Sequence, residues 1–401
     1  MNNLTAQPEL PPVVKEPLLS HRTKTTLAII VGIFLGLGLV TGIAAYFGYQ
    51  SYQHMFVKTN QPMVAPLVEN PEITPSPSPT PDPLAPFGVL LLGFGGGTHD
   101  GGYLTDTMMI AYVQPRDEKI TLISLPRDLW VQLPVSEQES KPFKINAAYA
   151  IGRDDRRYPD KPLEYTGEGG GGSLAKNVVG SVTGLPMKYF VALSFDGFVK
   201  SIDVIGGVPV NVPVTFDDPL YPIEEKKNDT CGISEEELVT RTATLSGQKL
   251  EQSFECRYEL LHFEKGLQTL DGTTALKYAR SRHSNQYGGD FARSERQKTI
   301  LVSVKNQIFS LQFLPKLIPF ISTLTRDMQT DIPLDVVREW IGKSEEYRSY
   351  EIDSIAITEQ NVLEYGYSSD RQYILKPKTG EFEWSGIQEF VKTEFEKSDG
   401  N

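Results

Sequence analysis

An uncharged, strongly apolar run near the N-terminus constrains the architecture of this 401-residue chain more than any other feature. It extends from Thr25 to Tyr49 and reads TTLAIIVGIFLGLGLVTGIAAYFGY. A helix that spans a membrane needs roughly 20 apolar residues, whereas the apolar part of a cleaved signal peptide has about 7–15. The run therefore predicts a transmembrane helix, and a cleaved signal peptide is the alternative that its length disfavours.

The charges beside this run predict its orientation. Arg22 and Lys24 stand directly before it, and basic residues flank the cytoplasmic end of a membrane span. Residues 1–24 then form a cytoplasmic tail, and the chain after Gln50 lies outside the cytoplasmic membrane. We accordingly expect a single-pass cell-membrane protein whose folded part is extracytoplasmic.

A proline-rich stretch separates the apolar run from the folded sequence. We assign it to residues 50–86, which include SPSPTPDP. Proline-rich segments adopt an extended polyproline II conformation and act as semi-rigid spacers. We expect this stretch to be a linker that holds the following domain away from the membrane.

Charge and cysteine content narrow the functional classes. The formal net charge of -12 argues against non-specific nucleic-acid binding, which requires a basic face. The two cysteines, Cys231 and Cys256, have no spacing that fits a zinc site. Outside the cytosol, two thiols in an otherwise cysteine-free chain favour one disulfide across a surface loop. Free or buried thiols are the alternative.

From Phe87 onwards, short apolar runs alternate with segments of helical periodicity. Such alternation predicts an α/β fold, here a three-layer α-β-α sandwich with a central mixed sheet. We expect strands at 88–93, 108–113, 119–125, 188–195, 208–214 and 351–357. We expect helices at 173–184, with Ser173 as N-cap, and at 195–207, 270–279, 290–308, 314–324, 334–342 and 385–395. The main domain covers 87–310 with an irregular acidic insertion at 217–260, and residues 311–401 add helices to it.

The stretch YARSRHSNQYGGDFARSERQ, from Tyr278 to Gln297, concentrates arginine in an acidic chain. Arginine presents a planar fork of donors that matches phosphate or carboxylate oxygens. The stretch therefore predicts an anion site, although solvated surface arginines paired with neighbouring acids are the alternative. Its arginines are Arg280, Arg282, Arg293 and Arg296, with Asp290 between them as a helix cap.

Two carboxylates and one arginine at predicted strand ends are further candidates. Asp106 opens a buried strand, Asp100 precedes it in the glycine-rich GFGGGTHDGG, and both carry the oxygen donors that Mg²⁺ prefers. Arg127 follows another strand, and we expect it to reach Asp106 only if an adjacent loop folds over. The glycine runs at 95–97 and 169–172 lack the ending of a phosphate-binding P-loop.

Taken in order, VLLLG, LTDTMMI, ISLPRDLWV, KINAAYAIG, FDGFVKSIDVIGGV and YARSRH…GDFARSERQ resemble the LytR-CpsA-Psr family of bacterial cell-envelope proteins. The resemblance implies a magnesium-dependent phosphotransferase that moves a glycopolymer from a polyprenyl-pyrophosphate carrier to peptidoglycan and forms a phosphodiester. We expect the polyprenyl tail of such a carrier to enter an apolar pocket between sheet and helices. A phosphohydrolase of the same carrier and a non-enzymatic lipid-binding envelope regulator are the alternatives.

The family's functional positions map onto this chain residue by residue. Asp106 matches the metal-binding aspartate, and the arginines that bind pyrophosphate match Arg127, Arg280, Arg282 and Arg293. Asp290, Arg296 and Gln297 match the rest of the same motif, and we expect Arg296 and Gln297 to bind the pyrophosphate as well. Asp128 or Asp290 are candidates to orient an arginine or act as base. We expect Asp106, Arg127, Arg282, Asp290 and Arg293 to be catalytic.

Two positions depart from the family pattern. Many members have an aspartate after the first strand, where this chain has Phe94, and an arginine where it has Leu104. Asp100 is our candidate to replace the missing carboxylate as a second metal ligand.

Overall fold

The structure is a computed structural model that describes residues 53–59, 82, 84–96, 102–245, 248–284, 286–308, 316–325 and 327–398. These residues belong to one unit, Tyr52–Asn401. The predicted membrane span, Thr25–Tyr49, and most of the predicted linker lie outside the described residues. Within the described residues, the structure contains no helix whose length and hydrophobicity would let it cross a membrane.

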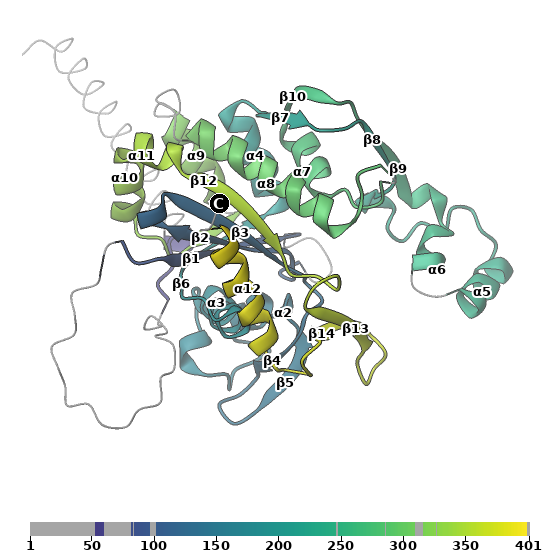
Figure 1. Cartoon of the computed structure of the whole chain (residues 1–401). Coiled ribbons are helices and arrows are strands. Elements are labelled where there is room, and N and C mark those ends of the chain that lie inside the picture. The colour runs from purple at the N-terminus through teal and green to yellow at the C-terminus, as the bar shows by residue number, and fades with distance from the viewer. Residues whose placement is uncertain are drawn as a thin grey trace, which may run out of the picture. The chain divides into compact units, whose positions relative to one another are not determined.

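A six-stranded mixed sheet forms the centre of the fold (Figure 1). Its order is β11-β6-β1-β2-β3-β12, and the β1–β6 and β3–β12 pairs are parallel whereas the other pairs are antiparallel. In chain order the strands are β1 (Phe87–Phe94), β2 (Thr105–Gln114), β3 (Lys119–Leu125), β6 (Met187–Ser194), β11 (Met328–Thr330) and β12 (Glu351–Ala356). The predicted α/β class with a central mixed sheet is confirmed.

Helices cover both faces of this sheet (Figure 1). One face packs against α2 (Ala147–Arg153), α3 (Gly170–Thr183) and α12 (Ser385–Ser398). The other face packs against α4 (Phe195–Ile205) and α8 (Gly289–Ile308). Because the sheet is covered on both sides, β1 can be apolar almost throughout, as the run FGVLLLGF shows. This arrangement is the three-layer sandwich that the alternating pattern predicts.

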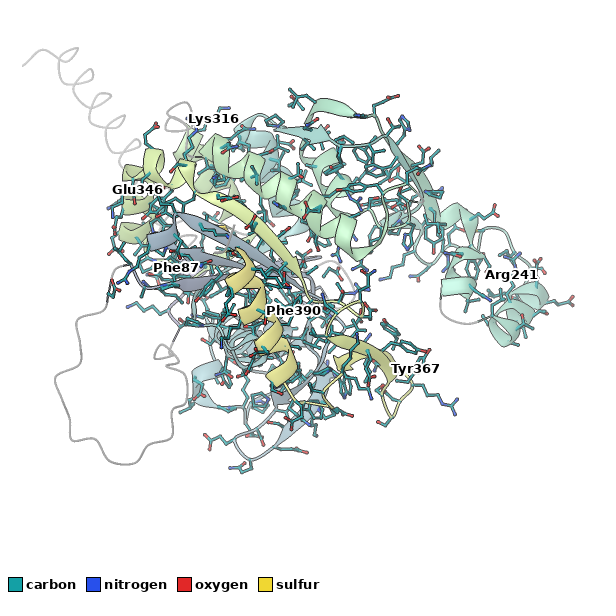
Figure 2. The ribbon with its side chains drawn as sticks, in the orientation of Figure 1. Phe87, Arg241, Lys316, Glu346, Tyr367 and Phe390 are labelled. Carbon is teal, nitrogen blue, oxygen red and sulfur yellow. A yellow bond between two sulfur atoms is a disulfide. The ribbon has the colours of Figure 1, made fainter. Side chains whose placement is uncertain are left out.

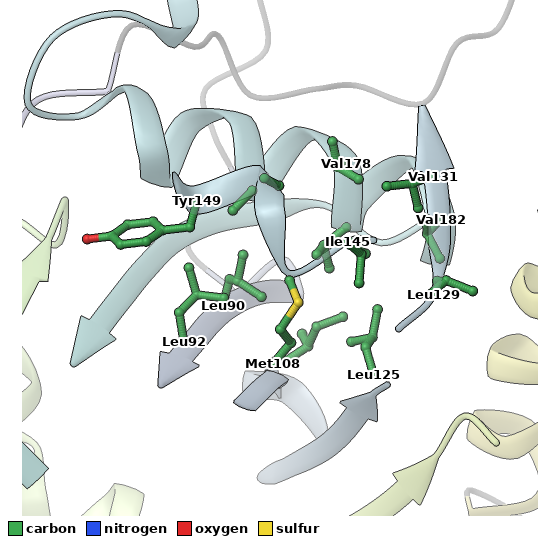
Figure 3. Packing of buried hydrophobic residues seen from close by; sticks show 14 of the residues in the cluster. Leu90, Leu92, Met108, Leu125, Leu129, Val131, Ile145, Tyr149, Val178 and Val182 are labelled. Atoms are coloured by element: carbon green, nitrogen blue, oxygen red, sulfur yellow. The ribbon is translucent and has the colours of Figure 1, made fainter. Parts of the chain in front are cut away.

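The first face holds the larger hydrophobic core. Figure 3 shows Leu90 and Met108 of the sheet directed toward Val178 of α3 and Tyr149 of α2. Burying such side chains stabilises the fold by about 1.5–3 kcal/mol each relative to leaving them exposed. The core therefore fixes the strand ends on which the candidate residues lie.

Close packing explains the glycine run before α3. The helix begins at Gly170, so Ser173 lies inside it and is not its N-cap as we predicted. A Cβ placed on Gly172 would lie 2.1 Å from the ring of Phe190 on β6, a distance that no real side chain tolerates. These glycines let a helix approach the sheet and do not form a phosphate cradle.

A second, smaller core lies around two antiparallel two-stranded sheets. These pair β7 (Val208–Val212) with β10 (Gly266–Leu270) and β8 (Phe216–Pro222) with β9 (Tyr258–Phe263). The two sheets pack with α4, α8 and α7 (Gly272–Arg280) around Phe216 and Tyr278. Most of β8 and the start of β9 fall within the predicted insertion, so those residues are regular strands and not irregular sequence.

The rest of the predicted insertion forms the arm between β8 and β9. It contains α5 (Glu235–Thr244) and α6 (Gln248–Gln252), and Figure 2 labels Arg241 on it. Cys231 and Cys256 are joined by a disulfide, which confirms the predicted pairing. The disulfide thus ties together the two ends of the arm.

The C-terminal part adds more than helices. It contains α9 (Leu317–Leu324), α10 (Leu334–Gly342) and α11 (Ser344–Ser349), and the hairpin of β13 (Leu363–Tyr367) and β14 (Tyr373–Pro377). A further hairpin, β4 (Trp130–Pro134) with β5 (Ser140–Lys144), precedes α2. We did not predict β4, β5, β13 or β14, because each has only five residues and no clear alternation of apolar and polar positions.

Residues 53–59, which we assigned to the linker, are bound to the folded domain. Met55 is 1% exposed, and the amide of Val57 donates to the carbonyl of Thr330 on the edge strand β11 at 2.9 Å. The hydroxyl of Thr59 donates to Asp331, whose carboxylate forms a buried ion pair with Lys176. The folded part of the chain therefore starts before the proline-rich segment.

Candidate active site

The antiparallel pairing of β2 with β3 brings the first two candidates together. Met108 pairs with Leu125, so the start of β2 and the end of β3 lie at the same edge of the sheet. Asp106 stands two residues before this pair, and Arg127 stands two residues after it. The loop movement that we expected to be necessary is not required, because antiparallel pairing alone makes the two residues neighbours.

Asp106 and Arg127 form an ion pair. Arg127 also lies 3.6 Å from Asp128, which in turn accepts a hydrogen bond from Lys144 at 2.7 Å. Burial on its own lowers the pKa of Arg127, but the charges of Asp106 and Asp128 outweigh it and the pKa is raised. Arg127 is therefore a permanent cation, and Asp128 orients it.

Three arginines of the stretch Tyr278–Gln297 converge on this ion pair. Arg280 ends α7, Arg282 follows it in a short irregular segment, and Arg293 lies in the second turn of α8. The guanidinium of Arg293 donates to the main-chain carbonyl of Asp106 at 3.0 Å. The sequence therefore places these arginines on two elements, and the fold brings them to one sheet edge.

The converging residues line a single open cavity of about 170 Å³, which we name the clamp cavity. Arg280 stacks over the ring of Phe195, with its guanidinium carbon 4.5 Å from the ring centroid, which holds this cation in place. Four guanidinium groups against the two carboxylates of Asp106 and Asp218 give the cavity an excess of positive charge. The lining residues are Asp106, Arg127, Asp218, Leu220, Tyr221, Pro222, Arg280, Arg282, His283 and Arg293.

Asp218 is a residue of this site that the sequence did not reveal. It lies on β8 with 1% of its surface exposed, and it accepts hydrogen bonds from the amides of Arg282 and His283 at 2.9 and 3.1 Å. The hydroxyl of Ser281 donates to the same oxygen at 2.7 Å. Burial raises the pKa of Asp218, but these hydrogen bonds outweigh it and the pKa is lowered.

The hydrogen bonds of Asp218 fix the backbone on which Arg282 stands. We placed Asp218 in an irregular insertion, and no motif marks it. The one available signal was its position in FDDPLY, between the apolar residues Phe216 and Tyr221 that pack into the second core.

Arg296 does not line the clamp cavity, and our prediction that it contacts pyrophosphate is corrected here. Its side chain is fully buried, and it donates to the main-chain carbonyls of Ser281 and Tyr287. Its guanidinium lies over Phe216, 5.1 Å from the ring centroid, and burial lowers its pKa. Arg296 therefore supports the loop that carries Arg282.

The other predicted site residues are Gln297, Asp290 and Asp100. Gln297 is 8% exposed and lines a second cavity, together with Arg293. Helix α8 begins at Gly289, so Asp290 lies within its first turn and does not precede it as a cap. Asp100 lies outside the described residues.

The second cavity, about 200 Å³ in volume, adjoins the clamp cavity. Arg127, Arg282 and Arg293 line both cavities. Asp106 and Arg280 line only the clamp cavity, whereas Thr358, Tyr373 and Leu375 line only the second, which we name the hairpin cavity. The three shared arginines can therefore contact a group that extends into both cavities.

The donor set at Asp106 is compatible with Mg²⁺. This ion is usually held by one or two carboxylates and by substrate phosphates, and it keeps several waters. In the described part of the chain, the only cluster of three potential metal ligands contains the disulfide-bonded cysteines and Asp229, so a rigid all-protein site is not formed there. Asp106, about one-third exposed at the mouth of the clamp cavity, suits a metal that arrives with phosphate.

A more apolar cavity of about 390 Å³ lies elsewhere, between β4, α3 and the segment before α12. Val131, Val178 and Trp384 are among the residues that line it. Its lining contains none of the clamp arginines. The position of the polyprenyl tail therefore stays a prediction.

Comparison with known proteins shows which proteins this chain is similar to. The teichoic acid transferase TagU of Enterococcus faecalis is 27% identical over 258 residues, 63% of this chain and 64% of that protein. TagV of Bacillus subtilis, also named a polyisoprenyl-teichoic acid–peptidoglycan teichoic acid transferase, is 26% identical over 68% of this chain and 56% of its own length. The chain thus spans less than two thirds of the length of either relative.

One solved structure supports the fold itself. Protein gbs0355 of Streptococcus agalactiae superposes with a TM-score of 0.51 at 22% identity, covering 78% of this chain and 88% of that one. Residues 52–381, which include every described strand, match the LytR_cpsA_psr family. The chain therefore belongs to the LytR-CpsA-Psr family.

Proposed function

We propose that this protein is a membrane-anchored, extracytoplasmic transferase that moves a glycopolymer from a polyprenyl-pyrophosphate carrier to peptidoglycan. The observation that carries the proposal is the clamp cavity, in which Arg127, Arg280, Arg282 and Arg293 surround Asp106. Phosphoryl transfer is catalysed mainly by positioning and charge stabilisation, and this cavity offers fixed positive charge. The relatives named as teichoic acid transferases support the same class of reaction.

In the proposed reaction, a hydroxyl of peptidoglycan attacks the phosphorus that carries the glycan. A phosphodiester forms, and the bond between the two phosphates breaks, so that polyprenyl phosphate leaves. Arg282 and Arg293, which line both cavities, stand where they can contact the transferred phosphate, while Arg280 serves the leaving phosphate. Their charge stabilises the negative charge that develops on the phosphate oxygens.

We propose Asp106 as the protein ligand for Mg²⁺, with Asp100 as a second candidate. A bound Mg²⁺ would neutralise charge on the pyrophosphate oxygens. Without it, Arg127 neutralises the Asp106 carboxylate in the ion pair already described. The Asp106 carboxylate therefore has a cationic partner in both conditions.

The predicted span Thr25–Tyr49 is the proposed anchor, since a lipid carrier keeps its tail in the membrane. An enzyme attached to the same membrane meets this substrate at its surface. The apolar tail would need a pocket of its own, which we expected between sheet and helices.

One assay tests the function and its alternatives together. The full-length chain in detergent is incubated with a polyprenyl-pyrophosphate glycan, a soluble peptidoglycan oligomer and Mg²⁺. A glycan–peptidoglycan adduct supports transfer, whereas hydrolysed carrier without an adduct assigns the protein as a phosphohydrolase. Lipid that is bound and recovered unchanged rejects both enzymes and leaves a lipid-binding regulator.

A further inference from the structure

The hairpin of β13 and β14 presents three tyrosines on one face. Tyr367 pairs with Tyr373 across the two strands, and Tyr365, two residues before Tyr367, pairs with Leu375. Opposite residues and residues two apart lie on the same side of a sheet, so these side chains share a face. Tyr365 and Tyr367 are 68% and 69% exposed, and Tyr373 is 41% exposed. Figure 2 labels Tyr367 on this hairpin, at the outside of the molecule.

This aromatic face continues into the hairpin cavity. Tyr373 and Leu375 line that cavity together with Arg127, Arg282 and Arg293. At the inner end of the same face, Leu363 and Leu375 are buried in the larger core. The hairpin is therefore anchored in the core at one end, shares a cavity with the three arginines and exposes aromatic rings at the other end.

The residues that line each of the two cavities indicate which substrate enters the hairpin cavity. Asp106 and Arg280 belong only to the clamp cavity, which is where the proposed function places the pyrophosphate donor. The hairpin cavity has the shared arginines but not these two residues. A second substrate that approaches the same phosphate from the hairpin cavity is the acceptor.

The chemistry of the face matches a carbohydrate. Exposed aromatic patches mark binding sites, and tyrosine offers a rigid, amphipathic surface at low cost in conformational entropy. Sugar rings present apolar C–H faces that stack on aromatic rings and hydroxyls that need acceptors. The carboxylate of Glu359 lines the hairpin cavity and accepts from the Tyr373 hydroxyl at 2.8 Å, so it offers such an acceptor and repels a polyanion.

We propose that Tyr365, Tyr367 and Tyr373 form an acceptor subsite, on which the glycan strand of peptidoglycan stacks and is led to the shared arginines. This inference rests on the proposed function for the identity of the second substrate. It assigns these tyrosines a role in binding the acceptor and none in binding the pyrophosphate.

The test compares the full-length wild-type chain with two double variants. Tyr365→Ala with Tyr367→Ala removes the exposed rings, and Tyr365→Phe with Tyr367→Phe keeps the rings as a matched control. The probe is a soluble, uncrosslinked oligomer of alternating N-acetylglucosamine and N-acetylmuramic acid. Binding is measured by titration calorimetry without donor, and transfer is measured with donor to obtain the KM of each substrate.

We expect the alanine pair to weaken oligomer binding and raise the acceptor KM by about tenfold, which corresponds to about 1.4 kcal/mol, since tyrosine is enriched among the residues that contribute most to binding. The donor KM stays at the wild-type value, and the phenylalanine pair behaves like wild type. Unchanged oligomer binding by the alanine pair would overturn the acceptor subsite. A raised donor KM in place of a raised acceptor KM would also overturn it and would assign the tyrosine face to the donor glycan. If wild type binds the oligomer but transfers nothing, the proposed function fails and the binding result still decides on the subsite.

Discussion

The two hydrophobic cores of this protein position different parts of the candidate active site. The larger core, around Leu90 and Phe190, joins the sheet to α2, α3 and α12, and the buried charges beside it, Lys176 and Asp331, pair with each other. The smaller core, around Phe216 and Tyr278, encloses the charged groups Asp218 and Arg296. The larger core sets the position of Asp106 and Arg127, and the smaller one sets the position of the arginine loop.

Buried charge is costly unless each charged group is paired or hydrogen-bonded. Asp218 and Arg296 meet this condition through the loop from Ser281 to Tyr287, whose backbone they hold from two sides. The charges thus serve to position a loop, whereas apolar packing alone would leave its backbone groups without partners. We therefore expect mutations in the larger core mainly to lower stability, and mutations in the arginine loop that the smaller core supports mainly to lower activity.

The largest effect on stability is expected in the larger core. Phe190→Ala removes a ring with no exposed surface, and we expect the free energy of unfolding to fall by about 3–5 kcal/mol. Urea denaturation of the purified protein measures this change. Leu163→Ala, at a side chain 75% exposed, is the control and should change stability by no more than about 0.5 kcal/mol. A loss at Phe190 as small as that would show that the core can collapse around the missing ring.

The largest effect on activity is expected at the loop. Arg282→Ala removes a guanidinium that lines both cavities, and we expect kcat to fall by about 10²–10³, as for the loss of one transition-state donor. The Tm should stay unchanged, because the side chain is not part of either core. A folded variant with wild-type turnover would refute the role that we assign to Arg282.

Asp218→Asn should affect stability and activity together. The amide replaces a carboxylate that accepts four hydrogen bonds, and we expect a loss of about 1–3 kcal/mol. Transfer should also slow, because Arg282 loses its support. Asp218→Glu, which keeps the charge, serves as the comparison, and normal transfer by a destabilised Asn variant would show that Asp218 has a structural role only.

The stabilising effect of Asp218 depends on pH in a defined direction. Its pKa in the folded protein lies below the ordinary value of 3.8, so its contribution is fully present above that value. The contribution is lost as the pH falls through the lowered pKa. The stability difference between wild type and Asp218→Asn should therefore stay constant at neutral pH and shrink in acid, as urea denaturation at several pH values will show.

The smallest effect on the reaction is expected in the arm that carries the disulfide. Replacing Cys231 and Cys256 with serine should leave transfer unchanged, because neither residue lines the clamp or the hairpin cavity. The arm between them should be cleaved faster by a protease, since the loop is no longer closed. A loss of transfer in this variant would mean that the arm takes part in substrate binding.

The two cores also explain how much could be predicted from the sequence. Apolar runs such as VLLLG and KITLISL predict strands well, because their burial on both faces leaves a local pattern. Arg127, Arg282 and Arg293 were found because they form motifs near predicted strand and helix ends. Asp218 was missed, because a buried carboxylate is defined by its partners some 60 residues away and by nothing in its neighbourhood.

Arg296 shows the complementary limit. It stands in the same motif as Arg293 and has the same local spacing, yet one side chain reaches the cavity and the other is buried beneath the loop. The packing of α8 in the fold, which places the Arg296 guanidinium over the ring of Phe216, determines which of the two arginines is buried. A cluster of arginines therefore predicts that an anion site is present, but not which of its members touch the anion.

The attachment of residues 53–59 to the sheet edge changes the physical role of the proline-rich sequence. Thr59 and Asp82 both interact with the same folded domain, through Asp331 and Arg116. The folded domain therefore holds both ends of the intervening sequence, and the number of residues between them enters the stability through loop-closure entropy. Doubling that number would cost only about 0.6 kcal/mol, so insertions there should be tolerated. A protease cut between Thr59 and Asp82 would leave two fragments that still co-purify as one particle.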